Sequence, residues 1–107
     1  MAQEDDIQLR LSAQRALLTH ITPSMRAVSV EVIPEQRRAW VQFIFDEKPS
    51  PDEEETASVA HGEILSDFVD EWTVELEMVR TPAPQRMEYL RLVVFHRCED
   101  EWVRGKM

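Results

Sequence analysis

The pattern of apolar and polar positions predicts two helices and four strands in this chain. The first helix starts after Asp5 or Asp6 as N-cap, and Pro23 closes it because proline disfavours helical geometry at the preceding residue. Its end is expected between Thr19 and Thr22. Its buried stripe is expected to consist of Ile7, Leu11, Leu17, Leu18 and Ile21.

Two strands joined by a turn follow the first helix. From Met25 to Ile33, Val28, Val30 and Val32 alternate with smaller or polar residues, and the segment 38–45 alternates again. The turn segment 34–37 separates them, so we expect a hairpin.

A second helix is predicted from residue 51 onward, and its start is the clearest local signal in the chain. Ser50 can cap the helix, Pro51 suits its first position, and Glu53 completes a capping box. The apolar stripe that follows at helical spacing consists of Ala57, Ala60, His61, Ile64 and Phe68.

Two further strands complete the pattern. The third, from Trp72 to Val79, alternates cleanly and turns an acidic face outward. An extended connection is expected at the prolines of segment 82–84. The fourth strand, 89–97, is apolar on both faces and is therefore predicted to be central or covered.

The resulting order is α-β-β-α-β-β, within a single α+β domain spanning residues 1–107. The simplest architecture is a four-stranded, mostly antiparallel sheet with two helices packed on one face. The second helix is a crossover between the second and third strands, so that pair could instead be parallel. We expect the tail 99–107 to fray, with Trp102 as a candidate anchor.

The charge of the chain narrows the class of partner. The formal net charge of −9 disfavours direct binding to nucleic acid. Twelve of the 21 acidic residues lie between Asp46 and Glu77, beside a single basic residue. Because the N-terminus has no leader pattern, no segment suits a membrane span and Cys98 is the lone cysteine, we expect a cytoplasmic protein.

The uneven charge provides the candidate partner-binding residues. Acidic side chains in a first helical turn complement the helix dipole, which explains part of the run but not the acids further along. Two interpretations stay open: a solvated acidic face, or a surface that attracts a basic protein. The candidate pool, with Trp72 as an apolar anchor, is Asp52, Glu53, Glu54, Glu55, Glu63, Asp67, Asp70, Glu71, Trp72, Glu75 and Glu77.

Other kinds of site have weaker support. Trp40 and Ile44 share a strand face that would form a homodimer contact if no other element covers it. His20, His61, His96 and Cys98 lack metal-ligand spacing, and we expect no metal, cofactor or catalytic nucleophile. A small enzyme or ligand-binding domain with a site around these histidines is the alternative to a binding protein.

Several segments resemble small bacterial immunity proteins of contact-dependent growth inhibition and other polymorphic toxin systems. They are segment 16–31, Phe43-Ile44-Phe45-Asp46, the acidic residues 52–55, segments 57–60 and 63–68, and Pro82-Ala83-Pro84. The resemblance covers about residues 10–97. It implies a non-enzymatic cytoplasmic antitoxin that neutralises a cognate toxin domain, commonly a basic nuclease, by covering its active site or substrate surface.

Overall fold

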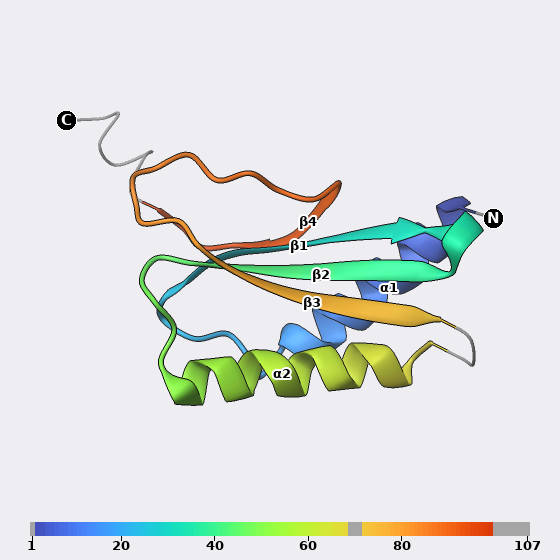
Figure 1. The fold of residues 1–107 in the computed structure, drawn as a ribbon, viewed down its shortest axis with the longest axis horizontal. Helices are drawn as coiled ribbons and strands as arrows, with labels where there is room; N and C mark the ends of the chain where they lie inside the picture. Colours follow the sequence, from blue (N-terminus) through green and yellow to red (C-terminus); the bar gives the residue numbers. More distant parts are fainter. Residues whose placement is uncertain (1, 69–71, 100–107) are drawn as a thin grey trace.

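The protein is an α+β fold in which two helices pack on a four-stranded mixed sheet (Figure 1). The computed structural model describes residues 2–68 and 72–99, with side chains from residue 7 onward. In chain order the elements are α1 (Ala2–Leu17), β1 (Met25–Ile33), the short 3-10 helix η1 (Pro34–Gln36), β2 (Arg38–Phe45), α2 (Pro51–Ser66), β3 (Thr73–Arg80) and β4 (Leu92–His96).

The strands lie in the order β3-β2-β1-β4, so the hairpin of β1 and β2 forms the centre of the sheet. Strand β1 pairs antiparallel with both β2 and β4, whereas β2 pairs parallel with β3. The parallel pair arises because α2 carries the chain back to the starting end of β2 before β3 begins. Of the two arrangements that the sequence left open for this pair, the parallel one is found.

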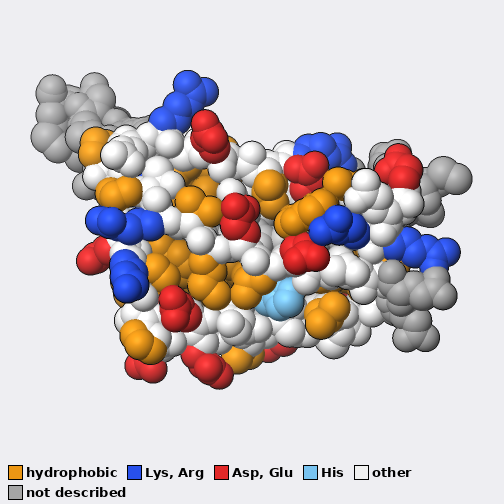
Figure 2. Space-filling model, viewed as in Figure 1, with side chains coloured by type: hydrophobic (Ala, Val, Ile, Leu, Met, Phe, Trp, Pro, Cys, Tyr) orange, Lys and Arg blue, Asp and Glu red, His pale blue; other side chains and the backbone are white. Residues whose placement is uncertain are grey.

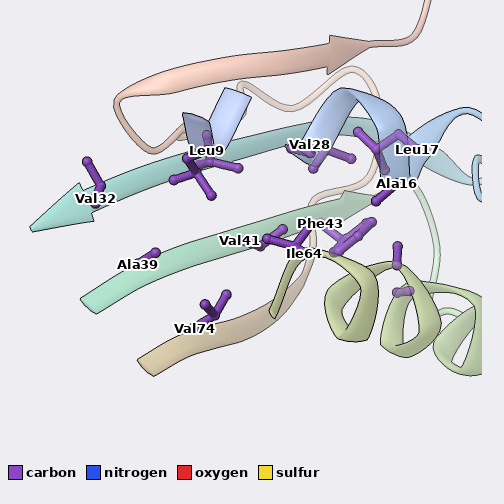
Figure 3. Packing of buried hydrophobic residues seen from close by; sticks show 14 of the residues in the cluster. Leu9, Ala16, Leu17, Val28, Val32, Ala39, Val41, Phe43, Ile64 and Val74 are labelled. Carbon is purple, nitrogen blue, oxygen red and sulfur yellow. The ribbon is translucent and has the colours of Figure 1, made fainter. Parts of the chain in front are cut away.

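The core lies between one face of the sheet and both helices (Figure 3). In Figure 3, Val28, Val41 and Phe43 point from the central strands toward Leu17 of α1 and Ile64 of α2. All five side chains belong to a single buried cluster. Burying such side chains supplies roughly 1.5–3 kcal/mol each, so this layer is the main source of stability.

Helix α1 turns a different face to the sheet than its large apolar residues predict. The side chains it buries are Leu9, Ser12, Ala13, Ala16 and Leu17. The predicted residues Ile7, Leu11, Leu18 and Ile21 are exposed, and only Leu17 of the expected stripe is buried. Small residues allow closer approach of the helix to the sheet, which explains why Ala13 and Ala16 face inward. The helix also begins before Asp5 and ends at Leu17, earlier than expected.

The opposite face of the sheet is partly covered by the segment 81–91, which crosses it before β4. Met87 packs on Ala27 of β1 and Ile44 of β2 in a second, smaller core cluster. The backbone N–H of Leu90 donates to Ser29 Oγ at 2.9 Å, and Ser29 Oγ donates to Gln42 Oε1 at 2.7 Å. This covered face therefore combines an apolar contact with a buried polar network.

Two predictions for this region are wrong. The prolines of segment 82–84 form a turn, closed by the Gln85 N–H and the Pro82 carbonyl at 2.8 Å, instead of an extended connection. Strand β4 is shorter than predicted, and of the two situations expected for it, central or covered, the central one is wrong because β4 lies at an edge of the sheet. Leu92, Val94 and Phe95 pack against the main core, while Val93 remains 41% exposed. Apolar residues on both faces of a strand therefore do not require a central position in this sheet.

Candidate partner-binding surfaces

The first turn of α2 carries acidic residues with two different roles. Glu53 completes the predicted capping box: Ser50 Oγ accepts from the Glu53 N–H, and Glu53 Oε1 accepts from the Ser50 N–H. Glu53 also accepts a hydrogen bond from the Ser24 hydroxyl. These hydrogen bonds, the one from Ser24 above all, lower the pKa of Glu53 to about 2. The Glu53 carboxylate therefore bonds to groups within the protein.

Asp52, Glu54 and Glu55 are the exposed acids of this turn. Within residues 7–68 and 72–99, none of the three has a cationic side chain at ion-pair distance. They complement the positive end of the α2 dipole and leave their charge directed to solvent. We call these three residues the α2 acidic turn.

Asp67, which ends α2, is used inside the protein. Its carboxylate accepts from Ser12 Oγ at 2.6 Å and from Arg15 Nη2 at 2.9 Å, both on α1. These bonds, the one from Ser12 first, lower the pKa of Asp67 below its ordinary range. Local partners on α1 therefore explain an acid that the helix dipole alone would disfavour at this end.

The remaining acidic candidates divide between the two faces of the sheet. Glu63 is an exposed residue of α2, 3.7 Å from His20. Glu75 and Glu77 lie on β3 with their side chains on the face opposite the helices, because Val74 and Leu76, which alternate with them, face the helix-side core. Glu75 pairs with Arg38 at 3.4 Å, a half-exposed contact that contributes little to stability.

Two candidates from the acidic pool, Asp70 and Glu71, lie outside the described residues. Trp72 is described and lies partly buried, with its ring 5.3 Å from that of Phe68 and its side chain against the main core. The described members of the acidic pool are therefore dispersed over several elements and do not form one continuous surface.

The sheet face proposed for dimerisation is open only in part. Ile44 is 1% exposed because Met87 covers it. Trp40 is half-buried, and the Arg38 guanidinium lies 4.7 Å from the centre of its ring. The segment 81–91 thus removes Ile44 from any contact with a second molecule.

The outer edge of β3 forms another candidate surface. His61 Nε2 lies 2.6 Å from the Val74 carbonyl oxygen, so this nitrogen carries the proton and donates it across from α2 to β3. Beyond Val74, the side of β3 that faces away from β2 has no comparable hydrogen-bond partner among the described residues. Figure 2 shows hydrophobic side chains on the surface between β3 and α2, with acidic side chains on either side of them.

Sequence reasoning missed a charged network around Arg26. This residue is 3% exposed, and its Nε and Nη2 donate to Glu99 Oε2 at 2.7 Å and Oε1 at 2.8 Å. Its Nη1 donates to the carbonyls of Thr81 and Gln85, both at 2.8 Å. Arg97 joins Glu99 at 3.0 Å and Asp46 at 3.1 Å. The network fastens the segment 81–91 to the sheet, and the available signal was an arginine near the start of a mostly apolar strand.

The histidines do not form a common site. His20 contacts the Ala16 carbonyl, His61 the Val74 carbonyl, and His96 the Tyr89 hydroxyl at 3.0 Å. His96 borders a cavity of about 940 Å³ beneath segment 84–90, where Arg26 and Glu99 bind each other. In the described part of the chain no group of three histidine, cysteine or acidic residues could hold a metal ion. No helix among the described residues is long and apolar enough to span a membrane.

Taken together, the two-helix α+β fold and its exposed carboxylates define a small protein that is suited to binding another macromolecule. The family model of the MafI2 immunity protein matches residues 6–99, and the chain belongs to this family. No curated protein matches the chain. The resemblance to bacterial immunity proteins is therefore confirmed, and with it an immunity role that involves a cognate toxin.

Proposed function

We propose that this protein is a cytoplasmic antitoxin that binds, without catalysis, the toxin domain of a contact-dependent growth inhibition system. The partner is a basic domain, such as a nuclease, and the α2 acidic turn guides its approach. The carrying observation is that Asp52, Glu54 and Glu55 are exposed and have no cationic partner among the described residues, in a member of an immunity protein family.

Electrostatic arguments favour the α2 acidic turn over the other acidic candidates as the surface that guides the toxin domain. Like charges held close together repel one another, which costs folding free energy, whereas a surface of one sign accelerates encounter with an oppositely charged partner. Arg15 offsets the charge of Asp67, whereas Glu53 keeps its charge but its carboxylate is occupied by the Ser24 hydroxyl and the Ser50 N–H. Glu63 on α2 and Glu77 on β3 are further exposed acids outside this turn. Trp72 remains the proposed apolar anchor of the interface, and Asp70 and Glu71 remain proposed contact residues.

The test uses the C-terminal domain of the secreted polypeptide encoded immediately upstream as the probe. Co-expression with the protein should restore growth of cells that produce this domain, and the two purified proteins should bind. Failure of both growth rescue and binding would refute the proposed function.

A charge-matched pair of variants tests the acidic surface separately. The triple variant Asp52→Asn, Glu54→Gln, Glu55→Gln should slow association about tenfold at low salt and flatten its salt dependence. The control is Glu35→Gln, Glu47→Gln, Glu88→Gln, which removes the same charge from exposed positions elsewhere. Equal association rates for the two triple variants would exclude the α2 acidic turn as the guiding surface.

A further inference from the structure

We propose that β3 accepts an extended, basic segment of the toxin domain as an added strand of the sheet, along the edge formed by Leu76, Met78 and Arg80. This inference rests on the proposed function and specifies how the partner docks. Four features of the described residues lead to it: backbone direction, the position of His61, the exposed apolar side chains and the charge of the neighbouring residues.

The backbone of β3 alternates between a paired and an open side. The N–H groups of Thr73 and Thr81 donate to the carbonyls of Arg37 and Phe45, at 2.9 and 2.8 Å. The backbone N–H and C=O groups of the odd-numbered residues of β3 therefore point toward β2. Because N–H and C=O direction alternates along a strand, Leu76, Met78 and Arg80 direct theirs away from the sheet. An edge that no other described segment pairs with is a template for another strand.

His61 limits the open edge at one end. Its ring donates to the Val74 carbonyl, which points to the outer side of β3 like the backbone groups of Leu76, Met78 and Arg80. The positions Glu54, Ser58, His61 and Leu65 recur at helical spacing, so they share the flank of α2 that faces β3. Leu65 is 42% exposed, and Leu76 and Met78 are only partly buried. An added strand would therefore meet apolar side chains on the side of α2.

The charges around this edge select the occupant. Glu77 is exposed on one side of β3, next to the half-exposed Glu75, which contacts Arg38 at 3.4 Å. Glu54 lies on the facing flank of α2. A basic strand would place its cations against these carboxylates, which favours cross-strand pairing. A second copy of β3 would instead bring Glu75 and Glu77 onto the same face as their counterparts, and like charges in that position are destabilising. The edge thus suits a toxin strand and not self-association.

Hydrogen exchange of individual amides tests the proposal on the unaltered protein. In the free protein, the amides of Leu76, Met78 and Arg80 should exchange quickly, whereas those of Glu75 and Glu77 are bonded to β2 and should exchange slowly. Adding the toxin domain that is encoded upstream should slow the first set by at least about tenfold and leave the second set unchanged.

A pair of variants at one position isolates the backbone contribution. Met78→Pro removes an outward N–H without breaking a bond to β2, and proline is tolerated on edge strands when its nitrogen faces solvent. Met78→Ala removes the same side chain and keeps the N–H. Relative to Met78→Ala, Met78→Pro should bind the toxin domain at least about tenfold more weakly, because a strand hydrogen bond is lost and the ring obstructs the edge.

The outcomes separate the two levels of the proposal. Binding of the toxin domain without slower exchange at Leu76, Met78 and Arg80 would overturn the added strand and leave the antitoxin function intact. Protection of these amides in the free protein, together with a mass that doubles with concentration, would assign the edge to a second copy and also overturn it. Absence of any binding would overturn the proposed function and the docking mode together.

Discussion

The buried pair of Arg26 and Glu99 gives the sharpest test of how the fold is held together. The hydrogen bond from Arg26 is the main reason that the pKa of Glu99 falls from 4.5 to about 2. The Glu99 side chain is 11% exposed, so solvent screens this interaction little. At about 1.4 kcal/mol for each pKa unit, the charged form of Glu99 contributes about 3 kcal/mol to stability at neutral pH.

The direction of the pH dependence follows from the lowered pKa. A carboxyl whose pKa is lower in the folded state stabilises the protein fully above its unfolded-state pKa, near 4.5. That contribution disappears as the pH falls from about 4.5 toward 2. Glu99→Gln should therefore lower the free energy of unfolding by about 3 kcal/mol at pH 7, and its difference from the wild type should shrink as the pH approaches 3.

Urea unfolding followed by circular dichroism at pH 7, 5, 4 and 3 measures this difference. The matched control is Glu47→Gln, which neutralises an exposed residue and should change stability by less than about 0.5 kcal/mol at each pH. The reasoning would be refuted if Glu99→Gln were as stable as the wild type at pH 7. A loss that stayed constant down to pH 3 would also contradict it.

Two further predictions concern the helices and use the same unfolding assay. Leu9→Ala should cost about 2–5 kcal/mol and Leu11→Ala less than about 1 kcal/mol, since Leu9 is fully buried and Leu11 is 53% exposed; equal losses would mean that α1 presents a different face to the sheet. Ser50→Ala should cost about 1 kcal/mol because it removes the acceptor for the Glu53 N–H, whereas Ser58→Ala, at an exposed position within α2, serves as a control that should leave stability unchanged.

Local signals predicted much of this fold. The capping box at Ser50 and Glu53 fixed the start of α2, and strict alternation set the bounds of β1 and β2. These signals succeed because they depend on neighbouring residues only. The rotation of α1 was not predictable in this way, because the burial of Ala13 and Ala16 depends on close approach to a sheet that forms later in the chain.

The candidate site was less accessible to sequence reasoning. The uneven charge along the chain predicted an acidic candidate region, but it could not separate Asp52, which is exposed, from Asp67, which binds Ser12 and Arg15. That distinction requires knowing which residues from distant segments meet. The open edge of β3 was also not predictable from the sequence, because it depends on the order of strands in the sheet.

The central position of the β1 and β2 hairpin also bears on the order in which the chain folds. The two middle strands are consecutive in the sequence, so they can pair after closing only the short turn around η1. Strands β3 and β4 then join opposite sides of this hairpin, and each must close a much longer loop. We therefore expect the hairpin to be formed in the folding transition state, with both edge strands added on the native side of the barrier.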